Sequence, residues 1–516
     1  MCRFGNRLDL AFGAAMNMLP PSMIQVSPQI KLKPFQRSGR TFIPHQIHLT
    51  GMRIMIEARD DSGQILWKDF PTSHGLYAPC LYDPTTRTIN ALPSMDWWSA
   101  PLARLFSEPH VKETPIQVHR RREAKTWIIL NTLDNIFGHS LLLLLNAQYY
   151  LDHFPQHGLI VIATPELLRY IPDDVHEIWE LKTTSRETER WHAPLDKFFH
   201  QRCAEAEVHI ATAPSHPDPS RYDLRHFNII PSEKPRITLA EASESISDGM
   251  SRKPAEDAPS PRGEGRGEGP LVANESSNLP NTLCPKIIFI YRGTRLWGGA
   301  WRSERARLIR LARWLKKLWP DSNLIIHGHA PLPSVVPHWT NRTRLNTAED
   351  YDGRLIHDLA TADLVLGAHG SSQLLPTAIA KLVLQLTQLD KQPSLLQDFL
   401  FDAPSAANSA VTQTPNLRQH LWRRRFLYGN STLSDISPRQ VAQLINAMIS
   451  MQAQFDFYQS TAASDPLRDP AEIEKEFAEK ISPQIEAWNH RLQQTLDRRL
   501  STRLKNYLRR MLAERD

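Results

Sequence analysis

The stretch ADLVLGAHGSSQLLPTAIA, residues 362–380, shows how this chain is built. A short apolar run at 364–366 leads into a turn of small residues at 367–372, and a helical pattern follows. In open parallel α/β sheets, a strand, a tight turn and a helix in this order form the edge at which ligands bind. The stretch therefore predicts an α/β fold with a ligand-binding turn.

The same alternation of buried strands and helices extends in both directions from this stretch. Further strands are predicted at KTWIILNTL (125–133), GLIVIAT (158–164), VHEIWEL (175–181), EVHIATA (207–213), KIIFIY (286–291), NLIIHG (323–328) and LVLQLTQ (382–388). Strands separated by helices in this way imply parallel, doubly wound sheets. We predict two such Rossmann-type halves that face a cleft.

Changes in hydrophobic pattern and composition divide the chain into regions. We predict the two halves at 119–232 and 285–465, after a β-rich region at 1–118. In that region the residues DDSG at 60–63 predict a hairpin turn. Residues 233–284 are rich in Pro, Gly, Ser and charged residues and have few large apolar side chains. We therefore predict a disordered linker or insertion there.

The C-terminal part, 466–516, is predicted to form an amphipathic basic helix. Leucines recur every fourth residue from Leu492 to Leu512, with arginines around them. Three interpretations stay open, namely a surface helix packed on the body, a helix lying on an anionic membrane surface, and a partner helix. No apolar stretch is long enough for a membrane span.

Composition narrows the classes of partner. A net charge of +6 and a pI near 9.1 favour an anionic partner, such as a phosphate-bearing substrate. No zinc-finger or RNP-like motif occurs, so we expect no nucleic-acid partner. The four cysteines form neither a CxxC pair nor a disulfide framework, which fits a cytoplasmic location. P-loop, G-x-S-x-G, H-E-x-x-H and G-x-G-x-x-G motifs are absent, which weakens the corresponding enzyme classes.

The turn after the strand at 364–366 is the first candidate site. Gly367 and Gly370 can take positive φ and let a ligand approach the backbone. The amides of Ser371 and Ser372 would open the following helix and point at an anion. His369 stands where an imidazole can donate to a phosphate oxygen. The alternative is an ordinary tight turn.

The second candidate is YRGTRLWGGAWRSER, 291–305, which follows another strand of the same half. Arg292 and Arg295 would clamp a diphosphate, because guanidinium binds phosphate oxygens bidentately. Trp297 or Trp301 could stack on a base or a sugar. The alternative is the solvated start of a basic helix.

The third candidate is NTLDNIFGHSLLLLLN, 131–146, at the end of a strand in the other half. Asp134 and His139 are candidates for the general base that deprotonates an attacking hydroxyl. The alternatives are a helix cap or turn residue and a histidine that bonds backbone. His216 lies in a turn-like segment and could line the same cleft.

Three segments together resemble the DUF563-type glycosyltransferases of family 61. These are DNIFGHSLLLLLNAQYYL (134–151), IIFIYRGTRLW (287–297) and ATADLVLGAHGSSQLL (360–375), of which the GAHG element is the most specific. The resemblance implies a GT-B fold, a nucleotide-sugar donor in the second half and metal-independent transfer. It places Gly367, His369 and Gly370 on the donor site. Arg292 and Arg295 would lie near the diphosphate, and His139 would face the acceptor.

These observations lead to one leading function. We expect a glycosyltransferase, hexosyl or pentosyl, that moves a sugar from a nucleotide-sugar to a glycan or lipid-linked acceptor. It would use no cofactor and no metal, and would work in the cytoplasm, free or peripheral on the inner membrane face. Two alternatives stay open, a non-catalytic binding protein of a surface-polysaccharide pathway and a nucleotide-sugar epimerase. Where family members often carry an acidic residue, this chain has Gln385 and Gln388.

Overall fold

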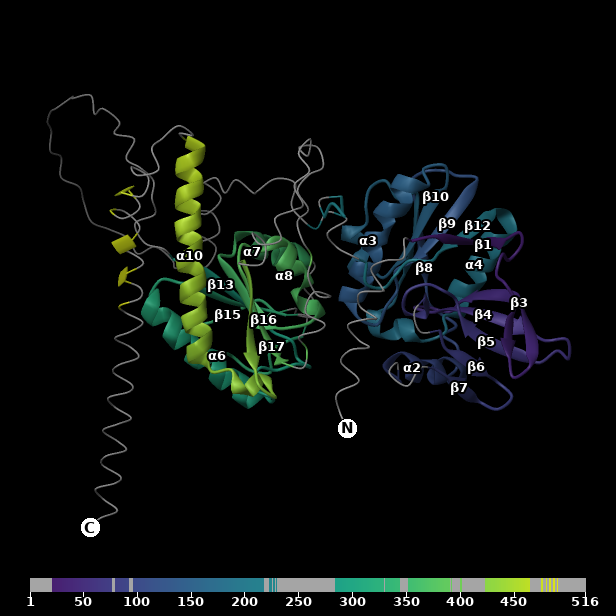
Figure 1. Ribbon diagram of the computed structural model, residues 1–516, viewed down its shortest axis with the longest axis horizontal. Coiled ribbons are helices and arrows are strands. Elements are labelled where there is room, and N and C mark those ends of the chain that lie inside the picture. Colours follow the sequence, from purple (N-terminus) through teal and green to yellow (C-terminus); the bar gives the residue numbers. More distant parts are fainter. Residues whose placement is uncertain are drawn as a thin grey trace, which may run out of the picture.

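Three six-stranded sheets organise the computed structural model of the chain (Figure 1). The structure describes residues 21–217 except 77–78 and 92–95, a few residues of 222–229, 284–391 except 329, 344–350 and 390, residue 400, residues 423–464 and isolated positions between 475 and 490. Two of the sheets contain parallel strands flanked by helices. The prediction of an α/β chain with parallel sheets is confirmed.

The first parallel sheet has the order β1-β12-β9-β10-β11-β8. Its strands are β1 (Met23–Ser27), β8 (Ile116–Arg120), β9 (Thr126–Asn131), β10 (Gly158–Ala163), β11 (Glu177–Leu181) and β12 (Glu207–Ala211). The four central strands are parallel, and Ile129 of β9 stands opposite Ile160 and Ile210. Because β10 lies on one side of β9 and β12 on the other, the strand order reverses between β9 and β12. Such a reversal point is where open α/β sheets bind ligands.

The second parallel sheet has the order β15-β14-β13-β16-β17-β18, with all neighbours parallel. Its strands are β13 (Lys286–Ile290), β14 (Asn323–His327), β15 (Thr340–Asn341), β16 (Leu364–Ala368), β17 (Val383–Gln388) and β18 (Arg424–Gly429). Here the order reverses between β13 and β16. The opening stretch of sequence therefore ends at the reversal point of this sheet.

The third sheet is an antiparallel meander of the N-terminal region. Its strands are β2 (Phe35–Arg37), β3 (Arg40–Leu49), β4 (Ile54–Arg59), β5 (Ile65–Asp69), β6 (Leu81–Asp83) and β7 (Thr88–Asn90). The predicted hairpin is confirmed, because β4 pairs with β5 across the turn at 60–63. Asp60 accepts hydrogen bonds from the amides of Ser62 and Gln64, which fixes that turn.

Helices cover the sheets on both faces, in the way their apolar patterns require. They are α2 (Asp96–Ser107), α3 (Phe137–His153), α4 (Ala193–Glu205), α6 (Trp301–Leu318), α7 (Tyr351–Thr361), α8 (Leu374–Ile379) and α10 (Pro438–Ser464). The described residues also form short 3-10 helices, η1 (His74–Leu76), η3 (Pro165–Tyr170), η4 (Ser185–Glu189), η6 (Ser371–Gln373) and η9 (Leu433–Asp435).

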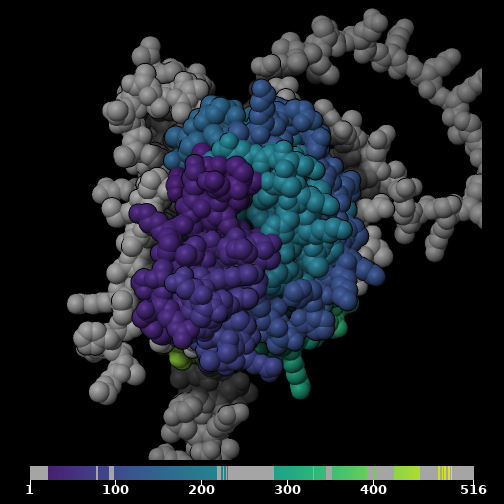
Figure 2. Space-filling model, turned by 90° about the vertical axis from the view of Figure 1, so that its right-hand side faces the viewer, coloured from purple at the N-terminus to yellow at the C-terminus, as the bar shows by residue number. Residues whose placement is uncertain are grey.

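Successive residues of a strand point to opposite faces of its sheet and so contribute to separate hydrophobic cores. In β13, Ile287 and Phe289 pack with α6 and α10, whereas Ile288 and Ile290 face the cluster that includes α7, α8 and α3. One apolar cluster thus joins the two halves. On the opposite face of the first sheet, Trp127 packs with the N-terminal sheet and α4. Figure 2 shows this purple sheet lying against the blue and teal chain of the first half.

Some expected boundaries differ in the structure. β1, in the region expected to be β-rich, and β8, which crosses the expected boundary at residue 118, pair with β12 and β11 as antiparallel edges of the first parallel sheet. The segment PELLRY, whose Pro165 suits the first turn of a helix, forms the 3-10 helix η3.

The predicted linker and most of the predicted C-terminal helix lie outside the residues that the structure describes. The linker at 233–283 lies outside the described residues, and so do the leucines and arginines of the C-terminal helix at 492–515. Across the described chain, no helix combines the length and the apolar character needed to cross a membrane.

Candidate functional site

Two loops meet at the reversal point of the second sheet. β13 leads into the loop with Arg292 and Arg295, and β16 leads into His369 and Gly370. Nη1 of Arg295 donates to the carbonyl oxygen of His369 at 2.5 Å. A Cβ added to Gly370 would overlap the guanidinium of Arg292, and the φ of Gly370 is +135°. Glycine is therefore needed there both for the backbone and for the close approach of the arginine.

This edge of the sheet is cationic. Arg295 is exposed, Arg292 is half-buried, and their guanidinium groups both lie against Gly370. Among the described residues, Arg295 forms no ion pair with a carboxylate. Two guanidinium groups over an exposed backbone turn can bind an anion with two oxygens, such as a diphosphate.

Several buried polar atoms beneath the turn have no hydrogen-bond partner among the described residues. They are both amide atoms of Gln373, the amide nitrogen of Gln385 and the hydroxyl of Ser372. Buried polar groups in native proteins are nearly always paired, with protein, ordered water or ligand. These atoms therefore supply hydrogen-bonding capacity next to the arginines.

The imidazole of His369 is held inside the fold. The residue is 3% exposed, and its Nδ1 lies 2.6 Å from Oε1 of Gln385 on β17. Because an amide oxygen only accepts, Nδ1 carries a proton in this contact. A neutral amide offers the ring no charge that would stabilise its cationic form.

A buried carboxyl group anchors the loop that carries the arginines. Glu304, near the start of α6, is 1% exposed and accepts a hydrogen bond from the amide of Gly298 at 2.8 Å. Burial raises the pKa of Glu304 to about 7, although the backbone bonds and Arg307 oppose this. The position of the loop that carries Arg292 and Arg295 therefore depends on Glu304, a carboxyl group with a pKa raised to about 7.

A second group of side chains gathers at the reversal point of the first sheet. Asp134 follows β9, His139 lies in the first turn of α3, and Ser215 and His216 follow β12. His74 comes from η1 of the N-terminal region, which is joined here by the hydrogen bond from the amide of Ser73 to the carbonyl of Ala213. The five side chains are drawn together from three separate parts of the chain.

The geometry of this group centres on Asp134. Its Oδ1 lies 3.2 Å from Nδ1 of His139, and its Oδ2 lies 3.6 Å from Nε2 of His74. The hydroxyl of Ser215 lies 3.1 Å from Nδ1 of His74. The ring centroids of His74, His139 and His216 are 5.0 to 5.7 Å apart.

The electrostatics favour an ionised carboxylate at Asp134. Burial alone would raise the pKa of Asp134, but hydrogen bonds and charge from His139 and His74 outweigh it and hold that pKa well below its usual range. Burial lowers the pKa of His74 and, more strongly, that of His216. Of the two histidines that contact Asp134, His139 is the more exposed, with 18% of its side chain exposed against 3% for His74.

The two reversal points meet across the halves of the molecule. Gly138 of α3 packs against Ser371 and Leu374, so closely that a Cβ on this glycine would overlap the Cβ of Ser371. Gly138 directly precedes His139, and Ser371 directly follows Gly370. The His–Asp group and the arginine-lined turn therefore belong to one site at the interface between the halves.

Two predicted residues have other roles than expected. Trp297 is fully buried and donates from Nε1 to the carbonyl of Ile436, so its ring has no face for a base or a sugar. Gly367 lies within β16 and does not take positive φ. Its lack of a side chain instead makes room for Gln373, whose amide nitrogen a Cβ would overlap.

Sequence reasoning missed His74 and Ser215. The signal for His74 was the segment TSHG at 72–75, whose polar residues follow a strand. Nothing local links it to Asp134, because the contact depends on how the N-terminal sheet packs on the first half.

Metal-ligand atoms gather at two places in the described part of the chain. One group is His74, Asp134 and His139, and the other is His48, Asp196 and His200, with ligand atoms of each group within 4.8 Å of one another. Two histidines and a carboxylate form a set that zinc accepts. The first group belongs to the site at the interface, and the second lies elsewhere.

Comparisons with known proteins give distant similarities alone. No family model matches the sequence, and no curated protein matches it. The E. coli heptosyltransferase WaaC with ADP is 13% identical, with a TM-score of 0.33, over 63% of this chain and 100% of that one. The E. coli ADP-heptose LPS heptosyltransferase II is 14% identical, with a TM-score of 0.30, over 64% and 99%. Scores this low do not establish a shared fold, so neither activity is carried over to this chain.

Proposed function

We propose that this chain is a glycosyltransferase of GT-B type that moves a sugar from a nucleotide-sugar to a glycan or lipid-linked acceptor. The observation that supports this most strongly is the contact of Gly138 with Ser371, which joins a cationic sheet edge to a His–Asp sheet edge. Transfer from a nucleotide-sugar needs one group for the leaving diphosphate and another for the attacking hydroxyl. Each edge offers one of them.

The donor diphosphate binds at the edge of the second sheet in this proposal. Arg292 and Arg295 neutralise the charge that grows on the leaving phosphate, which is the largest contribution a protein makes to such reactions. The amides of Ser371 and Ser372, in the first turn of η6, add donors that no carbonyl within that helix reaches. His369 acts through its carbonyl, which positions Arg295, and its ring is fixed by Gln385.

The acceptor is activated at the edge of the first sheet. Asp134 keeps the proton of His139 on Nδ1, so Nε2 is free of a proton and can act as the base. The acceptor oxygen then forms a bond to the anomeric carbon, the bond from that carbon to the phosphate oxygen breaks, and the acceptor proton passes to Nε2. The nucleoside diphosphate leaves between the arginines.

The proposal also covers the metal requirement, the type of sugar and the cellular location, which rest on the sequence. The reaction needs no metal, since the two arginines supply the positive charge, and the sugar is a hexose or a pentose. We propose a cytoplasmic location, with the basic segment at 466–516 as a contact to an anionic membrane surface.

The test begins with a thermal-shift screen of the purified chain against UDP-, GDP-, CMP- and ADP-sugars. The best donor is then incubated with and without acceptor glycans, and nucleotide and sugar products are analysed. We expect nucleoside diphosphate release that depends on an acceptor. A donor that raises the Tm without any release would identify a non-catalytic binding protein. Isomerised donor in the absence of acceptor would identify an epimerase.

The metal-ligand geometry of His74, Asp134 and His139 favours a second candidate, a metal-dependent hydrolase of nucleotide diphosphates at the same site. In that case the arginines would hold the substrate phosphates, and water would be the acceptor. A chelator separates the candidates, because it would abolish hydrolysis but leave metal-independent transfer intact.

A further inference from the structure

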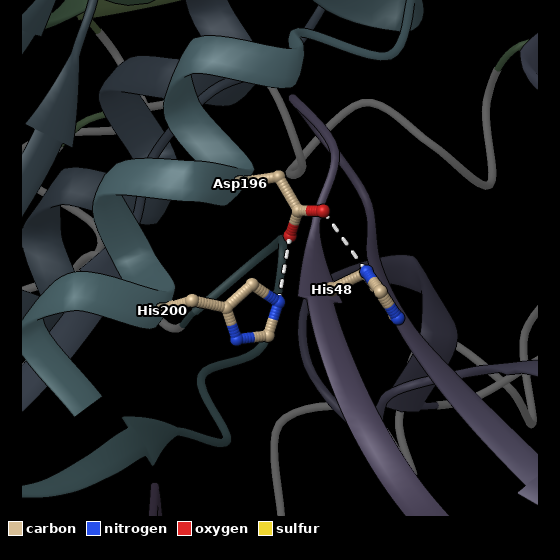
Figure 3. Close-up of side chains that lie close together, drawn as sticks. All are labelled: His48, Asp196 and His200. Carbon is tan, nitrogen blue, oxygen red and sulfur yellow. Dashed lines mark hydrogen bonds and ion pairs between the residues drawn. The ribbon is translucent and has the colours of Figure 1, made fainter. Parts of the chain in front are cut away.

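A second set of histidine and aspartate side chains lies between the N-terminal sheet and α4. His48 projects from β3, and Asp196 and His200 project from α4 (Figure 3). Nδ1 of His48 lies 2.9 Å from Oδ2 of Asp196, and Nε2 of His200 lies 3.4 Å from Oδ1 of Asp196. None of these residues takes part in the site at the interface between the halves.

The positions of the three side chains suit a metal ion. Asp196 and His200 are four residues apart on one helix, so they share a face, and β3 brings the third ligand to that face. Metal bonds of about 2.0 to 2.2 Å place the ligand atoms of a tetrahedral site roughly 3.2 to 3.6 Å apart. In the structure, one ligand atom from each of the three residues lies within 4.8 Å of the others, somewhat wider than this spacing. Small rotations of the rings would therefore admit an ion.

Neighbouring groups orient the ligands as in known metal sites. Oε2 of Glu57 lies 3.5 Å from Nε2 of His48, on the side away from Asp196. A carboxylate behind a metal-bound histidine fixes the ring and strengthens its binding. The side-chain nitrogen of Gln46 lies 3.2 Å from Nε2 of His200, the nitrogen that faces Asp196, so a bound ion would replace this contact. The amide of Leu49 donates to Oδ1 of Asp196 at 2.9 Å.

The surroundings leave a route for the ion. The rings of Trp67 and Trp191 lie 5.1 and 5.4 Å from that of His48 and form an apolar wall. An open cleft of about 490 Å³ is lined by Gln46, His200 and Cys203 among others. Cys203 is not among the residues whose ligand atoms lie within 4.8 Å of one another, so it is not a ligand in this arrangement. An ion would therefore keep one coordination position toward the cleft.

We propose that His48, Asp196 and His200 bind a divalent transition metal ion of the zinc class, with Glu57 as the supporting carboxylate. Two neutral imidazoles and one carboxylate leave the ion a net positive charge, which Glu57 balances at a distance. The ion ties β3 to α4 and so stabilises the packing of the N-terminal sheet on the first half. The competing interpretation is a hydrogen-bonded cluster that holds the same elements without an ion.

The experiment uses the full chain, stripped with a chelator and re-equilibrated with Zn²⁺ at a buffered free concentration. Bound zinc per chain is measured by elemental analysis for wild type, for the double variant His48→Gln/His200→Gln and for Asp196→Asn. The control is His119→Gln, which removes a histidine paired with the carboxylate of Glu180 where no third ligand lies within reach in the described chain.

We expect the double variant and Asp196→Asn each to lose one equivalent of zinc and the control to lose none. Zinc should also raise the Tm of wild type more than that of the variants. Any zinc bound at His74, Asp134 and His139 is present in wild type and in every variant, so it does not affect the difference in zinc content between them. Equal zinc content in wild type and Asp196→Asn would overturn the proposal and leave the hydrogen-bonded cluster. Asp196→Asn keeps an acceptor for the amide of Leu49, so it still tests the proposal if the double variant does not fold. The absorption spectrum of bound Co²⁺ in wild type and in Asp196→Asn provides an independent measurement.

Discussion

Gly138 and Ser371 touch across the interface between the two halves, one residue away from His139 and from Gly370 respectively. This contact puts the His–Asp group of the first sheet next to the arginine-lined turn of the second. It is also a tight contact, because a Cβ added to Gly138 would lie only 2.4 Å from the Cβ of Ser371.

The Gly138→Ala variant tests that contact. Helix propensity alone predicts that alanine in α3 would stabilise the chain by about 1 kcal/mol. The overlap of the new Cβ with Ser371 and Leu374 predicts the opposite sign, a loss of about 1–3 kcal/mol from the free energy of unfolding. Urea unfolding measures the sign. The control is Gly293→Ala, whose Cβ would meet its nearest neighbour at an ordinary 3.5 Å.

The Arg295→Ala variant tests the donor site. Loss of a charged hydrogen-bond donor should weaken binding of the nucleoside diphosphate by about tenfold or more, while the Tm without ligand changes little. Arg295→Lys should recover only part of the affinity, since an ammonium cannot bind two oxygens in a fork. Calorimetric titration checks both. The control is Arg305→Ala on α6, where the exposed guanidinium donates to the carbonyl of Val335. Equal affinities of Arg295→Ala and wild type would remove Arg295 from the site.

The Asp134→Asn variant tests the base. Without the carboxylate, the favoured proton position on His139 is lost, so kcat should fall by about 10²–10⁴ with little change in donor KM. The amide oxygen of asparagine can still accept the hydrogen bond from the amide of Ile136, so the turn is preserved. Steady-state kinetics with the donor from the screen measures the effect. Asp174→Asn, at an exposed aspartate paired with Arg122, is the control and should keep full kcat.

The Glu304→Gln variant tests a pH dependence of stability. Burial raises the pKa of Glu304 from 4.5 to about 7, so the folded chain holds this proton more tightly than the unfolded chain. The stability from this group is complete below the unfolded pKa and is lost as the pH rises through the folded pKa, by up to about 3 kcal/mol.

Urea unfolding at about pH 5 and about pH 8 checks this prediction. Wild type should lose stability relative to Glu304→Gln between the two conditions, since glutamine still accepts from Gly298 but carries no charge. The exposed Glu205→Gln on α4 should follow wild type. If the difference between wild type and Glu304→Gln did not depend on pH, Glu304 would not be the buried titrating group.

Local patterns in the sequence predicted the elements well where burial is uniform. The runs TWIILN and KIIFI have continuous apolar centres, WIIL and IIFI, because both faces of each strand are covered there, and they form β9 and β13 as expected. β1 and β18 gave weaker signals, since edge strands mix apolar and polar residues. Their place in the parallel sheets was therefore not predicted from the sequence.

The sequence by itself determined that Arg292, Arg295 and the turn at 367–370 follow strands, and the carboxyl ends of parallel strands share one edge of a sheet. That geometry alone brings them together, and the structure shows the contact. Only the tertiary structure decided that His74 joins Asp134, that Trp297 is buried and that His48 meets α4. Those contacts depend on how separate layers pack, which hydrophobic periodicity along one segment does not encode.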